Sequence, residues 1–223
     1  MTNGASGGTW SISNSRATIS VSGVVTGITA GLDTVSYTVI NGCGTDIATK
    51  IITINPLPDA GTISGPSSVC VGSSITMTDA ATGGAWSSSN ARATITTGGI
   101  VTGVTSGIDS IYYTVTNVCG TDVARHIIVV NALPVLTSTT SPAAICDGST
   151  FNYTPTSDSA SASFSWSRAA VSGISNIAGS GTGNISEMLN STSNSGVAVT
   201  YIYTTSANGC STTQNVAQRI AQI

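Results

Sequence analysis

The sequence predicts an all-β protein, and three observations lead to this prediction. The stretch GGTWSISNSRATI, from Gly7 to Ile19, returns as GGAWSSSNARATI from Gly83 to Ile95, which is a shift of 83 − 7 = 76 residues. Thr, Ser, Gly, Val and Ile dominate the chain, and only 7% of its 223 residues are charged. β-branched residues favour strands and glycine favours turns. Apolar residues also recur with a period of two, as half-buried strands require.

The repeat extends well beyond this stretch, without a gap. The same shift carries Trp10 to Trp86, Tyr37 to Tyr113, Cys43 to Cys119, Pro58 to Pro134 and Cys70 to Cys146. Self-similarity at a fixed period is typical of stacked structural units. Proline-containing stretches at residues 55–58 and 131–134 stiffen the chain and mark the boundaries between units.

Three segments follow from these boundaries. Residues 56–132 form the complete copy, and about seven short strands in about 75 residues indicate an immunoglobulin-like sandwich. Residues 1–55 read as a partial copy without its front strands. Residues 133–223 begin with a similar cysteine-containing stretch and then diverge, which indicates a related sandwich. The expected architecture is a series of tandem immunoglobulin-like β-sandwich domains in an elongated array.

Charge and hydropathy exclude several classes of function. The net charge is −3 and the six Lys and Arg residues are scattered, so no basic patch is available for nucleic acid or an anionic membrane. No apolar run approaches the roughly 18 residues of a membrane span. The start of the chain is polar, so we expect either an excised segment or an export signal on a part of the protein outside this sequence. Five cysteines at repeat-related positions indicate an oxidising compartment. We therefore expect an extracellular or cell-surface location.

The motifs resemble a known family. GGxWSSSN, ATI and VTGVTSGxD, followed by YTV and CGTD, resemble bacterial immunoglobulin-like (group 2) repeats of very large Bacteroidota surface proteins. ICDGSTFNYTPTS and NGCSTTQNV in the third segment resemble the PKD-like modules found beside them, although the tryptophan-flanked aspartate motif of classical PKD domains is absent. The resemblance implies a cell-surface adhesin of the gliding type, exported by type IX secretion.

Candidate catalytic and binding residues favour structural roles. Trp10, Trp86 and Trp166 occur once per segment, as a core tryptophan would. Catalysis by the single histidine, His126, would need a triad that the sequence does not offer. Glu187 is the only glutamate and lies in a loop-like stretch, so paired carboxylates are hard to assemble. We expect no enzymatic activity and no cofactor. No metal site is expected either, because the sequence has no calcium-loop motif and no His/Cys ligand cluster, and a calcium ion at a domain junction is the alternative.

Repeated aspartates read as features of the fold. Asp33 and Asp109 are related by the repeat, as are Asp46 and Asp122. We expect them to cap turns, or to pair with Arg16 and Arg92.

The cysteines carry the strongest chemical signal. We expect Cys70 to pair with Cys119, and Cys146 with Cys210, each bond closing one segment. In a plain immunoglobulin topology these positions can lie at opposite ends of a sandwich, so free thiols or a bond to a neighbouring chain are the alternatives. The repeat places the partner of Cys43 at 70 − 76 = −6, before Met1. We therefore expect an unpaired Cys43 in a segment cut from a longer array, with an open sheet edge that favours self-association or strand donation.

Three Asp-Ser/Thr sequences followed by an apolar residue match the O-glycosylation pattern that the resemblance implies. They place the modified hydroxyl at Thr34, Ser110 or Ser159, although each stretch also reads as a turn that starts a strand.

The expected function is that of a non-catalytic stalk segment in a secreted or surface-bound bacterial adhesin or fibre. Its partners would be neighbouring repeats of the same polypeptide. The alternatives are a glycan- or protein-binding module, with the third segment as the recognition domain, and a spacer in a secreted polysaccharide-degrading enzyme.

Overall fold

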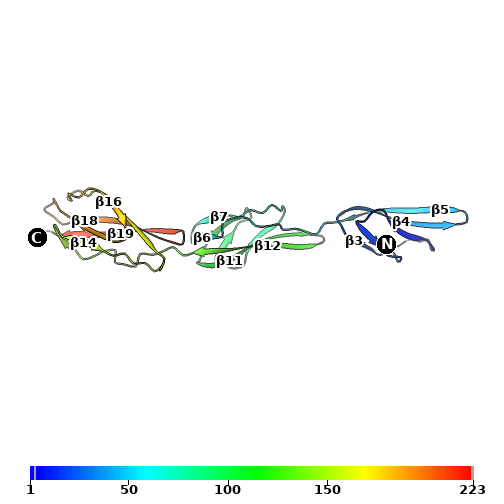
Figure 1. The fold of residues 1–223 in the computed structure, drawn as a ribbon, viewed down its shortest axis with the longest axis horizontal. Helices are drawn as coiled ribbons and strands as arrows, with labels where there is room; N and C mark the ends of the chain where they lie inside the picture. The colour runs from blue at the N-terminus through cyan, green and yellow to red at the C-terminus, as the bar shows by residue number, and fades with distance from the viewer. Residues whose placement is uncertain (3, 222–223) are drawn as a thin grey trace. The chain divides into compact units, whose positions relative to one another are not determined.

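The computed structural model describes residues 1–223 except 3, 222 and 223, and contains nineteen strands and no helix among them (Figure 1). The predicted all-β fold is confirmed. Each sheet is built from strands of a single segment, and no sheet mixes strands from two of them.

The first segment forms two small sheets. One has the order β1-β4-β5 and the other pairs β2 with β3. The strands are β1 Thr9–Ile12, β2 Ala17–Ile19, β3 Val25–Gly27, β4 Gly31–Asn41 and β5 Gly44–Ile54. β4 and β5 form one long hairpin, whose register runs from Gly31 opposite Ile54 to Asn41 opposite Gly44. The turn of this hairpin and residue 54 therefore lie at opposite ends of the sheet.

The second segment has a four-stranded sheet in the order β6-β12-β11-β8 and a three-stranded sheet in the order β7-β10-β9. This division of seven strands agrees with an immunoglobulin-like sandwich. The strands are β6 Ser68–Cys70, β7 Ser74–Thr76, β8 Ala85–Ser88, β9 Ala93–Ile95, β10 Ile100–Gly103, β11 Gly107–Asn117 and β12 Gly120–Asn131.

The third segment has a five-stranded sheet, β13-β19-β18-β15-β16, and a two-stranded sheet, β14-β17. Its core contains aromatic side chains from both sheets, among them Phe151, Tyr153, Tyr201 and Tyr203. The strands are β13 Ile145–Cys146, β14 Thr150–Tyr153, β15 Ser163–Arg168, β16 Gly179–Thr182, β17 Ile185–Met188, β18 Val197–Ala207 and β19 Cys210–Ala221. Glu187 lies in β17, so the prediction of a loop there is wrong.

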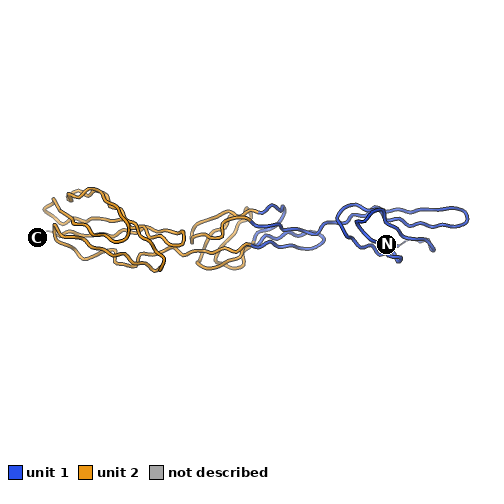
Figure 2. Tube along the Cα trace, in the orientation of Figure 1, with its two compact units in different colours: residues 1–63, 79–86, 112–125 blue, residues 64–78, 87–111, 126–223 orange. Residues whose placement is uncertain are grey.

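The described residues group into two compact units (Figure 2). One contains residues 1–63, 79–86 and 112–125, and the other contains residues 64–78, 87–111 and 126–223. The second segment contributes to both units, so the predicted domain boundaries at residues 55/56 and 132/133 stay a prediction.

The repeated GGxW motif has a packing explanation within the first unit. Trp10 lies 4.7 Å from Tyr37 between ring centroids, and Trp86 lies 4.6 Å from Tyr113. The Tyr113 hydroxyl accepts a hydrogen bond from the Gly84 amide at 2.9 Å. A Cβ on Gly84 would lie 2.5 Å from the Tyr113 ring, so only glycine permits this approach. Gly8 makes the same approach to Tyr37.

Candidate functional site: the cysteine-bearing hairpins and segment junctions

In the second and third segments, the early-strand cysteine lies beside the C-terminal end of the last strand. β6 pairs with β12 in parallel, and Cys70 is the register partner of Asn131, the final residue of β12. β13 pairs with β19 in parallel, and Cys146 is the register partner of Ala221. Both cysteines therefore lie at the C-terminal end of the last strand of their own segment.

The hairpin cysteines lie at the other end of the same strands. Cys43 and Cys119 occupy the turns before β5 and β12, and Cys210 is the first residue of β19. β12 and β19 each contain 12 residues. At about 3.3 Å per residue, the two ends of such a strand are separated by about 35–40 Å. A disulfide needs its Cα atoms within about 7 Å, so one segment cannot close on itself through these positions.

The structure instead contains a disulfide between Cys70 and Cys210, with a Cα–Cα distance of 5.8 Å and a sequence separation of 140 residues. It joins the second segment to the third. The expected pairings of Cys70 with Cys119 and of Cys146 with Cys210 are therefore wrong, because each would span the length of a sandwich. Cys43, Cys119 and Cys146 are free and exposed.

Hydrogen bonds surround this disulfide at the junction. The Asn131 side chain donates to the Asn208 carbonyl at 3.0 Å. The Leu136 amide donates to the Gln214 side chain at 2.7 Å, and the Thr212 hydroxyl donates to the Pro134 carbonyl. The β18–β19 hairpin thus binds residues 134–136, at the start of the third segment, and also Asn131, the last residue of β12.

The β11–β12 hairpin holds the chain at residues 55–60 in a similar way. The Asn117 side chain donates to the Pro56 carbonyl at 3.0 Å. The Cys119 thiol lies 3.7 Å from the Asn55 carbonyl oxygen. The Asp122 carboxylate accepts from the Ala60 amide at 2.8 Å. Three side chains of one hairpin therefore bind the Pro-rich stretch.

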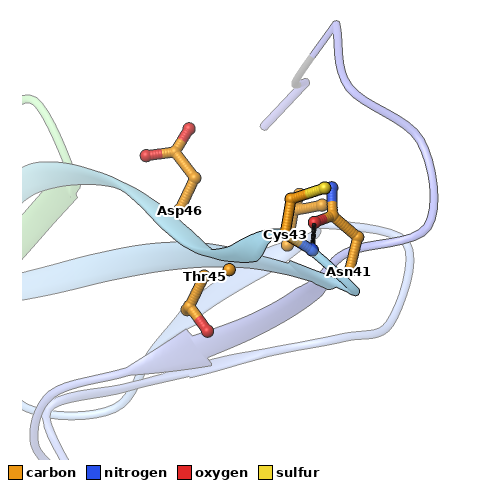
Figure 3. A pocket seen from close by; sticks show the side chains of 6 residues that line it. Asn41, Cys43, Thr45 and Asp46 are labelled. Carbon is orange, nitrogen blue, oxygen red and sulfur yellow. Dashed lines mark hydrogen bonds between the residues drawn. The ribbon is translucent and has the colours of Figure 1, made fainter.

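The β4–β5 hairpin carries the repeat equivalents of these side chains. Asn41, Cys43 and Asp46 line an open pocket together with Val39, Gly44 and Thr45 (Figure 3). The Cys43 amide donates to the Asn41 side chain at 2.9 Å, as the Cys119 amide does to Asn117 at 2.8 Å. The local geometry of the turn is therefore the same in both copies.

Two of the four repeated aspartates, Asp33 and Asp109, cap turns as expected, whereas Asp46 lies within β5 and Asp122 accepts from the distant Ala60 amide. The Asp109 carboxylate accepts from the Ser89 amide and hydroxyl, the Ala93 amide and the Ser110 amide at 2.7–3.1 Å. Burial raises the pKa of Asp33, but the hydrogen bonds that its carboxylate accepts lower this pKa by more. The pKa of Asp33 therefore lies below the usual value for an aspartate. Arg16 and Arg92 donate to backbone carbonyls of Ala30 and Ser106.

An ion pair between the buried Arg168 and the half-buried Glu187 gives Glu187 a structural role in the third segment. Two guanidinium nitrogens of Arg168 contact its carboxylate at 2.6 and 3.1 Å. The Tyr201 hydroxyl donates to the same carboxylate at 2.6 Å. Burial, and then Glu187, raise the pKa of Tyr201 far above its usual value. Because these hydrogen bonds join β15, β17 and β18, the cluster ties the two sheets together.

The other candidate residues do not form a site. Trp166 is half-buried and packs against the third-segment core. His126 is half-buried in β12, and its Nε2 atom has no hydrogen-bond partner in the described part of the chain. Among the described residues, no group of three or more His, Cys, Asp or Glu side chains is placed to hold a metal ion. The described residues also contain no helix long and apolar enough to cross a membrane.

The predicted glycosylation positions differ in exposure. Ser110 is 5% exposed, so a glycan cannot be attached there unless β11 opens. Thr34 and Ser159 are half-buried. All three positions stay predictions.

Sequence reasoning missed the asparagine two residues before each hairpin cysteine. Asn41, Asn117 and Asn208 share this spacing, and the second and third contact the preceding junction. The shared Asn-x-Cys spacing was the signal that could have identified them.

Comparison with known proteins gives likeness in fold only. No family model and no curated protein matches the sequence. A structure of three immunoglobulin domains of a titin variant has a TM-score of 0.42 at 14% identity, covering 99% of this chain and 90% of that one. Extracellular domains 3–5 of Drosophila OTK have a TM-score of 0.36 at 11% identity, and the match covers 95% of this chain and 79% of that one.

A SusE-like surface-located polysaccharide-binding protein of Bacteroides thetaiotaomicron gives a TM-score of 0.30 at 11% identity, covering 98% of this chain and 56% of that one. All three TM-scores lie below 0.5, so we draw neither function nor partner from these likenesses.

Proposed function

We propose that the chain is a non-catalytic, load-bearing repeat segment of a secreted or cell-surface bacterial adhesin or fibre. The observation that carries the proposal is the disulfide between Cys70 and Cys210, which links two successive segments and spans 140 residues of sequence. A bond that only stabilised one sandwich would join residues of the same segment.

The position of the bond defines a path for tension. Force applied at the two ends of the chain would enter through β6, cross the disulfide, and leave through β19. The residues between Cys70 and Cys210 lie outside this path, so they cannot be drawn out while the bond holds. This arrangement suits a stalk that must keep its length under load.

Composition supports the same role. With 7% charged residues and a net charge of −3, the chain offers little for non-specific ionic binding. The resemblance to Bacteroidota surface repeats agrees with an extracellular location and with export by type IX secretion, which we include in the proposal.

Single-molecule force spectroscopy of the chain held by its ends tests the proposal. In the oxidised protein, unfolding should withhold a contour length of roughly 140 residues × 3.3–3.6 Å, about 460–500 Å, which a reductant releases. Cys70→Ser is the control and should release this length without reductant. If the oxidised chain extends as far as the Cys70→Ser variant, the load-bearing role is wrong.

The glycan-binding alternative finds less support. Trp166, the third-segment side chain best suited to stacking on a sugar, packs against core residues, and Tyr201 and Tyr203 are fully buried. A glycan array probed with the chain should therefore remain blank. Binding that is lost when residues 133–223 are removed would favour the alternative.

A further inference from the structure

The outer edge of β5 differs from its counterparts in the other two segments. The last strand of the second segment, β12, is covered in parallel by β6, and β19 is covered in the same way by β13. In the order β1-β4-β5, β5 is the edge strand, and no strand of the described part of the chain pairs with its outer side. An unpaired edge of this kind is a template for another strand.

The repeat specifies how a strand would pair there. In the second segment, the Val129 amide donates to the Ser67 carbonyl at 2.9 Å, and the Val71 amide donates to the Asn131 carbonyl at 3.0 Å. Subtracting 76 from 129 and 131 gives Thr53 and Asn55. We therefore expect the Thr53 amide and the Asn55 carbonyl to be the groups that bond an incoming strand.

Burial indicates that this strand carries an apolar residue. Val69 of β6 is buried, and Val130 and Ile128 of β12 are 1% and 0% exposed. Their equivalents in β5, Ile54 and Ile52, are only half-buried. An incoming valine or isoleucine would remove apolar surface from water at this edge.

A free thiol lies at the same place. Cys70 is the register partner of Asn131 and bonds to the hairpin cysteine Cys210. Asn55 is the repeat equivalent of Asn131, and the exposed thiol of the hairpin cysteine Cys119 lies 3.7 Å from its carbonyl oxygen. A cysteine placed in register with Asn55 would therefore meet Cys119.

We propose that the outer edge of β5 and Cys119 form an acceptor site for one short parallel strand of the Ser-Val-Cys type, supplied by a repeat of the same kind. The thiol that closes this site is Cys119, and Cys43 at the far end of β5 is not part of it. The inference extends the linking of segments proposed above. Its failure would leave the Cys70–Cys210 load path intact, because that bond is tested separately.

The covalent step is a thiol–disulfide exchange. The Cys119 thiolate attacks the incoming cysteine sulfur, which arrives as a mixed disulfide with a small thiol. A new S–S bond forms, the old one breaks, and the small thiolate leaves. The Cys119 proton passes to water, and no net oxidation occurs.

The test uses the chain with Cys70–Cys210 formed and a peptide of residues 66–73, PSSVCVGS, activated as its thionitrobenzoate mixed disulfide. A Cys43→Ser/Cys146→Ser variant leaves Cys119 as the free thiol. A Cys119→Ser/Cys146→Ser variant leaves Cys43 in the same turn geometry, and is the matched control. The comparison peptide carries Val69→Asp and the same activated cysteine.

We expect Cys119 to capture the native peptide about tenfold faster than the Val69→Asp peptide, since burial of a valine is worth roughly this factor. Cys43 should react equally with both peptides. Hydrogen exchange of the Thr53 amide should slow in the Cys119 adduct and not in the Cys43 adduct.

Two results would overturn the proposal. One is equal capture of both peptides by Cys119 with no protection of Thr53, which would mean that the thiol reacts without strand pairing. The other is a dimer in which a disulfide joins the Cys119 residues of two copies and the Thr53 amides stay unprotected, because Cys119 would then bond another hairpin cysteine and no strand would occupy the β5 edge.

Discussion

At the scale of single residues, the repeated stretch at residues 83–95 is defined by contacts to the backbone. Its second glycine leaves room for a tyrosine ring, and its serine and asparagine side chains hydrogen-bond within a turn. The amide of its second alanine donates to the buried Asp109 carboxylate. The Asp109 carboxylate is 1% exposed and accepts four hydrogen bonds, from Ser89, Ala93 and Ser110. The reappearance of this set around Asp33 explains why the sequence is so well retained between copies.

Replacing this carboxylate should weaken the second segment. In Asp109→Asn, one acceptor oxygen becomes an NH2 group that faces the Ala93 amide. We expect a loss of about 2 kcal/mol in the free energy of unfolding. Hydrogen–deuterium exchange of residues 85–95 measures it. Asp46→Asn, at an exposed position, is the control and should change exchange little; equal exchange in both variants would contradict the assignment.

Buried tyrosines should make the third segment sensitive to alkali. Burial raises the pKa values of Tyr153, Tyr201 and Tyr203 above the usual value of roughly 10. Below pH 10 these groups are protonated in both states. As the pH rises further, only the unfolded chain loses their protons, so folding stability falls.

Urea unfolding at pH 9, 10 and 11 checks this, with tyrosinate absorbance near 295 nm recorded alongside. We expect the urea midpoint to fall above pH 10 and part of the tyrosinate signal to appear only on unfolding. Complete ionisation of all tyrosines near pH 10 while the β-sheet circular dichroism signal persists would refute the role of burial.

At the scale of elements, the long last strand of each segment decides the cysteine chemistry. In the second and third segments, the hairpin cysteine lies at or directly before the first residue of this strand, and the early-strand cysteine adjoins its last residues. The number of residues in the strand therefore keeps the two sulfurs apart within one segment. The partner of Cys70 is Cys210, which lies in the β18–β19 hairpin of the next segment.

Removing this disulfide should cost stability in the segments that it joins. For a closed loop of 140 residues, the chain-entropy model gives about 5 kcal/mol. We expect Cys70→Ser to lower the urea midpoint of unfolding markedly, as followed by far-ultraviolet circular dichroism. Cys146→Ser removes a free, exposed thiol and is the matched control. Equal midpoints for the two variants would show that the bond adds nothing to folding.

At the scale of the whole molecule, a covalent link accompanies the peptide chain from the second segment to the third. The Pro-containing stretch at residues 131–134 is held by hydrogen bonds of Asn131 and Pro134, and the disulfide provides a second connection. The second and third segments therefore stay covalently linked when either the peptide chain between them or the disulfide is cleaved.

A protease site inserted between residues 132 and 133 tests this directly. After cleavage, the two fragments should migrate together on a non-reducing gel and separate when a reductant is added. In the Cys70→Ser variant they should separate without reductant. Separation of the unmutated fragments under non-reducing conditions would contradict the link between segments.

The sequence by itself determined the all-β class and the repeat. These depend on composition, periodicity and spacing, which are local properties of the chain. It also indicated that Asp33 and Asp109 cap turns, because an Asx side chain acts on backbone amides near it.

Only the tertiary structure decided which cysteines meet. The repeat arithmetic related Cys70 to Cys146 and Cys43 to Cys119, and the expected topology allowed the two classes to lie at opposite ends of a sandwich, yet neither showed that Cys70 meets Cys210 of the next segment. The same limit applied to Glu187, whose partners Arg168 and Tyr201 lie on other strands. A disulfide and a buried ion pair both depend on distances between strands that are remote in sequence, and strand pairing fixes those distances.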